Sequence, residues 1–168
     1  MQKIVFIKEK EKQIMKIVYE SNTGHTEKYA NMLAEKLNLK SIPLKKYKID
    51  SEPIIFLGWI FANNIQGYKK VKDKTNIKCT IAVGMTPTAK QNNSEIIKIN
   101  NVSEKFFYLQ GGVDYKKLKG IKKFMLKIVA ESVIKENKPE NKELIDMFLN
   151  GGNCVKEENL SEILEYLY

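Results

Sequence analysis

The chain has 168 residues and a formal net charge of +9 at pH 7, and 43% of its residues are hydrophobic. This length and composition predict one globular domain with a full core, and no apolar run approaches the roughly 20 residues that span a bilayer. All 29 basic residues are lysine and no nucleic-acid-binding motif occurs, so we expect no nucleic-acid partner.

Residues 1–14 precede the first clear strand and do not resemble a signal peptide. They lack a sustained apolar stretch and a small-residue cleavage site, and they carry a charged run over 8–12. We expect an extension that is loosely attached or not native, followed by a single domain over 15–168. The two cysteines, Cys79 and Cys154, have no metal-ligand spacing, which favours a reduced, cytoplasmic protein without a metal site.

The first strand is predicted over 15–20, and a polar turn leads from it into a helix at 26–37. A strand, a tight turn and a helix N-terminus form a cradle for an anion, because the first backbone N–H groups of a helix have no partner within it. The turn contains no Lys or Arg, so neutral donors would hold one terminal phosphate. Its hydroxyl groups belong to Ser21, Thr23 and Thr26, and Gly24 permits the tight turn.

This turn lacks the motifs of P-loop NTPases and of dinucleotide-binding domains. The alternative interpretation is an ordinary turn in which Thr26 caps the helix. The rest of the chain alternates strands with helices, which predicts an α/β fold with a parallel sheet. Strands are expected at 39–44 (an edge strand, because of its proline), 53–59, 78–85 and 105–110, and helices near 64–72, 141–149 and 158–168, with a reduced helix between 85 and 105.

A lysine-rich segment follows the last predicted strand. Residues 105–127 hold seven Lys and one acid, Asp114. An amphipathic helix is predicted here from the apolar residues Leu118, Ile121, Phe124, Met125, Leu126, Ile128 and Val129. It is either an ordinary core helix with a solvated Lys face or a surface at 116–127 that meets an anionic membrane or an acidic partner.

The turn at 21–26, Ser-Asn-Thr-Gly-His-Thr, resembles the [ST]-x-T-G-x-T phosphate loop of flavodoxins, and the strands ending at 57–59 and 82–84 resemble their third and fourth strands. This resemblance implies a doubly wound, five-stranded parallel sheet of order 2-1-3-4-5 that binds flavin mononucleotide (FMN) where the strand order reverses. It also implies that the phosphate receives side-chain bonds from Ser21, Thr23 and Thr26 and backbone N–H bonds from Asn22, Gly24 and His25.

Two further loops would face the flavin ring in such a protein. One is the loop Trp59, Ile60, Phe61, Ala62 and Asn63, and the other is Met85, Thr86, Pro87 and Thr88. Trp59 and Phe61 are equally well interpreted as core residues or as flavin-stacking residues. His25, the only histidine, is expected to be a solvent-facing loop residue rather than a proton donor. No catalytic side chain is expected, because the flavin itself would supply the redox chemistry.

The chain departs from electron-carrier flavodoxins in its basic charge and in a helical insertion at about 111–152. Residues 108–115 and 123–128 are loosely similar to menaquinone-dependent protoporphyrinogen oxidases, which implies a subfamily shape and no substrate. We expect an FMN-binding redox protein that acts in electron transfer or as an oxidoreductase, with a redox partner protein or a quinone-like molecule. The alternatives are a quinone- or porphyrinogen-directed enzyme at a membrane surface and a flavin-free binding or regulatory domain.

Overall fold

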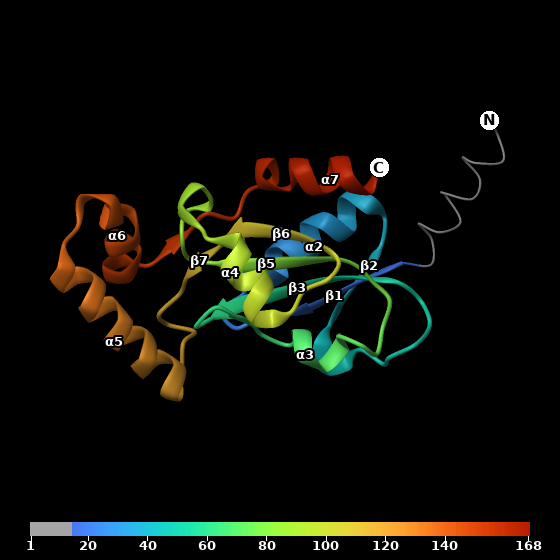
Figure 1. Cartoon of the computed structure of the whole chain (residues 1–168), viewed down its shortest axis with the longest axis horizontal. Helices are drawn as coiled ribbons and strands as arrows, with labels where there is room; N and C mark the ends of the chain where they lie inside the picture. Colours follow the sequence, from blue (N-terminus) through green and yellow to red (C-terminus); the bar gives the residue numbers. More distant parts are fainter. Residues whose placement is uncertain (1–14) are drawn as a thin grey trace.

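Five parallel strands form the centre of the molecule (Figure 1). The computed structural model describes residues 15–168, so the predicted extension at 1–14 lies outside the described residues. The order across the sheet is β2-β1-β3-β5-β6, which confirms the predicted 2-1-3-4-5 order of a doubly wound α/β fold. The strands are β1 (Lys16–Glu20), β2 (Lys40–Pro43), β3 (Ile54–Phe61), β5 (Ile77–Gly84) and β6 (Lys105–Gln110).

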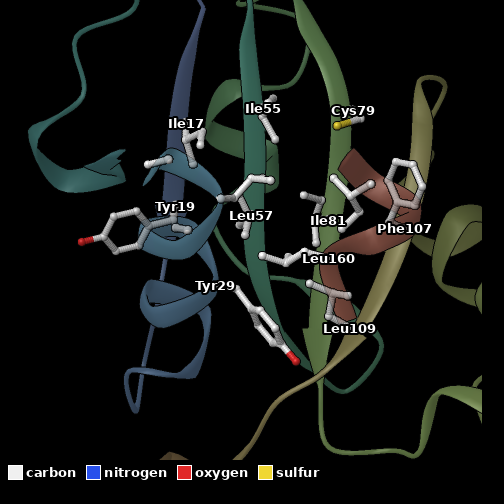
Figure 2. Packing of buried hydrophobic residues seen from close by; sticks show 14 of the residues in the cluster. Ile17, Tyr19, Tyr29, Ile55, Leu57, Cys79, Ile81, Phe107, Leu109 and Leu160 are labelled. Carbon is white, nitrogen blue, oxygen red and sulfur yellow. The ribbon is translucent and has the colours of Figure 1, made fainter. Parts of the chain in front are cut away.

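The central strands read as continuous apolar runs because helices cover both faces of the sheet. On one face lie α2 (His25–Leu37) and α7 (Ser161–Leu167), and on the other α3 (Tyr68–Val71) and α4 (Asn93–Asn100) (Figure 1). Figure 2 shows the first of these cores, in which Tyr29 of α2 lies over the strand residues. Among residues 15–168, β2 pairs only with β1 and lies at the edge of the sheet, which suits a strand that ends in proline.

The insertion predicted at 111–152 leaves the sheet at the end of β6. Its base is a two-stranded antiparallel ribbon of β7 (Gly112–Val113) and β8 (Gly152–Asn153). Between these strands run α5 (Gly120–Glu136) and α6 (Lys142–Asn150), which stand together beyond the end of the sheet (Figure 1). The insertion is therefore placed at the carboxyl ends of the parallel strands, where ligands bind in this class of fold.

The interpretation of the lysine-rich segment as a core helix is wrong. Three of its predicted core residues lie on the surface, with Ile121, Phe124 and Ile128 exposed by 72%, 63% and 51%. The helix instead turns Ala130 inward, with Leu126 partly buried beside it. Apolar residues occur on both faces of α5, so periodicity alone could not identify the face that packs.

Smaller differences concern the ends of elements. The strand predicted to stop at Trp59 continues to Phe61, because a short strand β4 (Asn64–Ile65) pairs antiparallel with its end. The predicted helix at 64–72 is therefore reduced to α3. A short α4 confirms the reduced helix before β6, and a 3-10 turn (Glu157–Leu160) precedes α7. Within residues 15–168, no helix is both long enough and apolar enough to cross a membrane.

Candidate functional site

The turn between β1 and α2 has the geometry of an anion-binding loop. Gly24 has a φ of +99°, a conformation that glycine adopts without strain, and the helix begins at His25. The Ser21 hydroxyl oxygen accepts the Gly24 N–H at 3.2 Å and the Glu27 N–H at 3.4 Å, which leaves its hydrogen free to donate. Thr26 lies inside α2, so the interpretation of Thr26 as the helix cap is wrong.

Thr26 is the most informative residue of this loop. The residue is 1% exposed, and its hydroxyl group makes no hydrogen bond in the part of the chain that the structure describes. Its oxygen is not among the fully enclosed polar atoms that lack a partner, so it remains accessible from the cavity. Thr26 and Thr23 both line a cavity at the carboxyl ends of β3 and β5. An unpaired donor beside a helix N-terminus and a cavity is suited to bind an anion.

His25 is not the solvent-facing residue that we expected. It is 8% exposed, and its Nδ1 atom lies 3.0 Å from the Thr23 hydroxyl oxygen. Its ring packs against the base of the insertion, so that a Cβ on Gly112 would lie 3.0 Å from Nε2. Burial and the charge of Lys28 lower the pKa of His25, while a hydrogen bond to the Gly152 backbone opposes that shift. A neutral ring that donates from Nε2 to Gly152 leaves Nδ1 to accept the Thr23 hydroxyl hydrogen.

The predicted ring-binding segment after the third strand divides into two parts. Trp59, Ile60 and Phe61 belong to β3 and line the cavity. Their two aromatic rings lie 5.8 Å apart, and neither belongs to a buried core cluster, so the core interpretation is wrong. Ala62 and Asn63 instead form the tight turn into β4, with φ values of 47° and 59°, and do not line this cavity.

The segment after β5 also divides. Met85 lines the cavity together with Val83 and Gly84, the last residues of β5. The next residues turn away, and the Thr86 carbonyl accepts the Tyr108 hydroxyl at 2.7 Å. Thr86, Pro87 and Thr88 are therefore not brought to this cavity, contrary to the expectation that they line the ring.

Comparison with known families shows the family of this chain. A family model described as a flavodoxin domain matches residues 16–140. The chain belongs to the flavodoxin domain family. No curated protein matches it. Among solved structures, rubredoxin oxygen:oxidoreductase from Desulfovibrio gigas matches with 16% identity and a TM-score of 0.39, over 85% of this chain.

The match to that oxidoreductase covers 40% of its length, so this chain spans less than half of it. Within this flavodoxin domain, the family match runs from β1 through α5 and ends before α6. The match therefore includes the turn at 21–26, both cavity-lining strand ends and the first helix of the insertion.

The insertion forms a wall of the cavity that sequence reasoning missed. Leu118, Lys122 and Leu126 line it opposite the phosphate loop, and the Lys122 ammonium lies 4.7 Å from the centre of the Trp59 ring. The cavity has a volume of about 80 Å³, whereas small-molecule sites usually measure roughly 300–1,000 Å³. No sequence signal related these residues to the loop, because the fold alone brings them together.

The residues of this flavodoxin domain fit a flavin phosphate. Ser21 and Thr26 provide uncommitted hydroxyl hydrogens, and the N-terminus of a 13-residue helix provides partial positive charge. Aromatic and aliphatic side chains lie on the side of the cavity away from the loop, where an apolar ring system would bind. The described residues contain no cluster of three or more His, Cys, Asp or Glu that could hold a metal ion.

Proposed function

We propose that this flavodoxin domain binds FMN in the cavity and acts as a redox protein through it. The observation that carries this proposal is the Thr26 hydroxyl group, which makes no hydrogen bond within residues 15–168 and remains accessible beside the cavity at a helix N-terminus. When bound, FMN supplies one- and two-electron transfer, so the protein needs to supply binding, orientation and exclusion of water.

The chain's residues take separate roles in this proposal. Ser21 and Thr26 donate to the phosphate from the loop, and Thr23 donates to it when its hydroxyl hydrogen turns from His25 Nδ1 to the phosphate. Trp59 and Phe61 present aromatic surface to the ring, as stacked or edge contacts between aromatic groups are favourable. Because the cavity measures only about 80 Å³, we expect the insertion to move outward when the ring binds. Both cysteines are free, which suits the cytoplasmic location that we also propose.

The test begins with the visible absorbance spectrum of the full chain as purified, followed by identification of the cofactor released on denaturation. We expect bound FMN. Trp59 is the only tryptophan, so its fluorescence reports directly on the cavity. Titration of the cofactor-free protein with FMN should quench this fluorescence. A colourless protein that does not bind added FMN would contradict the proposal and favour the flavin-free binding or regulatory domain.

A second candidate function is favoured by the surface of α5. Ile121, Phe124, Met125 and Ile128 are all exposed and share one side of the helix by their spacing. We define these four residues as the apolar stripe. The same helix carries Lys122, Lys123 and Lys127, which are also exposed, although by helical spacing they lie to the side of the stripe or opposite it. An exposed apolar face on a lysine-rich helix is suited to an anionic membrane surface, and such a surface suits an oxidoreductase that acts on a quinone or a porphyrinogen.

Flotation of the full chain with vesicles tests the second candidate. We expect binding to vesicles that contain anionic lipid, weaker binding to neutral vesicles, and loss of binding in the Phe124→Ser/Ile128→Ser double variant. Ile99→Ser is the matched control, because Ile99 is also an exposed apolar residue but belongs to α4. Equal flotation of the two variants would contradict a role for the stripe. Turnover of a quinone with NAD(P)H then distinguishes an enzyme from an electron carrier.

A further inference from the structure

We propose that Lys117 of the insertion binds the phosphate of the cofactor, so that the insertion completes the phosphate site. This inference rests on the proposed FMN function and extends it to a residue outside the loop motif. The loop itself contains neither Lys nor Arg. The positive charge that the loop lacks is therefore supplied from about ninety residues further along the chain.

The geometry places the Lys117 ammonium beside the loop. Its Nζ atom lies 3.6 Å from the position that a Cβ on Gly24 would occupy, and no other atom outside the neighbouring residues lies within 4 Å of that position. Gly24 therefore leaves the loop backbone open on the side that Lys117 faces. An ammonium group at this distance is within reach of an anion bound on the same loop.

The backbone around Lys117 is held in place near the base of the insertion. The Lys117 N–H donates to the Asp114 carbonyl at 3.1 Å, and the Lys116 N–H donates to the Asp114 carboxylate at 3.0 Å. This turn directly follows β7, which is paired with β8. Lys117 thus lies before α5, at the end of the insertion that moves least if the helix shifts outward to admit a ring.

The charge on Lys117 is uncommitted. Its ammonium group makes no hydrogen bond within residues 15–168, and its nearest carboxylate oxygen, on Asp114, is 3.9 Å away. The two side chains are 60% and 37% exposed, so this ion pair is weak and screened by solvent. A phosphate monoester carries close to two negative charges at neutral pH, whereas a helix N-terminus offers about half a positive charge. A nearby ammonium therefore improves the charge balance of the site.

Neighbouring lysines lie differently. Lys122 is directed over the Trp59 ring, on the ring side of the cavity. Lys116 is exposed beside Lys117 but does not approach the loop. Lys116→Gln consequently makes the same change in net charge as Lys117→Gln, one residue away, and serves as the matched control.

The experiment measures FMN and riboflavin affinity by Trp59 fluorescence in the full-length protein and both variants. Riboflavin lacks the phosphate, so its affinity shows whether Lys117 binds the phosphate or only supports the structure of the site. We expect Lys117→Gln to weaken FMN binding about 5- to 20-fold, near the lower end for a charge-assisted hydrogen bond. Its riboflavin affinity should match that of the unaltered protein, and Lys117→Arg should retain most of the FMN affinity. FMN binding should also weaken less with added salt in Lys117→Gln than in the unaltered protein.

Two results would overturn the inference while leaving the FMN function intact. One is equal FMN affinity in Lys117→Gln and Lys116→Gln. The other is an equal loss of FMN and riboflavin affinity in Lys117→Gln, because a residue that binds the phosphate cannot contribute to the binding of riboflavin, which has none. An unaltered protein that binds neither compound would instead overturn the proposed function, and with it the inference.

Discussion

Replacing Thr26 with valine separates two effects of the Thr26 hydroxyl group. One is its effect on the stability of the cofactor-free protein, and the other is its effect on FMN affinity. Valine has nearly the same shape and a similar helix propensity, so the change removes one polar group and creates no cavity. Thr26 is 1% exposed and its hydroxyl has no partner within the described residues. A fully buried, unsatisfied polar group costs about 1–3 kcal/mol, and the Thr26 oxygen is not fully enclosed. We therefore expect Thr26→Val to raise the free energy of unfolding of the cofactor-free protein by at most about 1 kcal/mol.

The same substitution should weaken FMN binding. A hydrogen bond to a charged group contributes about 1.5–3 kcal/mol, which corresponds to roughly a 10- to 150-fold change in affinity. Urea unfolding of the cofactor-free protein measures the first effect, and fluorescence titration with FMN measures the second. The two effects have opposite signs for one substitution, which a general loss of structure cannot produce.

Thr80 provides the matched control for this experiment. It is also fully buried, but its hydroxyl group donates to the Glu104 carboxylate, far from the cavity. Thr80→Val should therefore lower the free energy of unfolding by about 1–3 kcal/mol and leave FMN affinity unchanged. A cofactor-free Thr26→Val protein that is less stable than the original and binds FMN with unchanged affinity would refute the assignment of Thr26 to the phosphate site.

Three further predictions concern His25, Gly112 and the extension. Because burial lowers the pKa of His25 below its free value of 6.5, its contribution to stability is complete above pH 6.5 and declines as the pH falls further. In urea unfolding between pH 7.5 and 5.5, the free energy of unfolding should fall less with decreasing pH in His25→Gln than in the unaltered protein. An equal fall in both proteins would contradict this prediction. Gly112→Ala should lower the free energy of unfolding by about 1–3 kcal/mol in urea unfolding, because the new Cβ would overlap the Gly152 backbone. An unchanged urea midpoint would argue against the β7–β8 pairing. Deletion of 1–14 should leave the thermal midpoint of the single domain at 15–168 unchanged, and a fall in midpoint would show that these residues stabilise it.

The sheet and the strand–turn–helix arrangement around residues 21–26 could be predicted because their signals are local. Residues 54–57 are an apolar run and residues 79–83 are apolar except for Thr80, and helical segments between such strands require them to be parallel. The loop lies in one continuous stretch between a strand and a helix, so its context was visible in the sequence. The boundary at Trp59 was predicted too early, because the pairing that extends β3 comes from residues beyond the turn.

The remaining parts of the site depend on contacts between distant segments. His25 is buried by Gly112 and Gly152, which lie more than eighty residues away, and its own surroundings in the loop are polar. Lys117 reaches the loop for the same reason. From the sequence, the two glycine pairs at 111–112 and 151–152 indicated only where a strand and a helix end. In the structure, their lack of side chains lets the β7–β8 ribbon pack against His25.

The position of α5 relates the cofactor site to the surface. Leu126 faces the cavity while Phe124 and Ile128 face solvent, so one helix separates the proposed ring site from the exposed stripe. The cavity measures about 80 Å³, so an outward shift of the insertion that admits a ring system would move the stripe as well. If α5 shifts as one body, a surface that binds the stripe and a flavin that occupies the cavity would act on the same displacement. The β7–β8 pairing at the base of the insertion would keep Lys117 at the loop during such a shift.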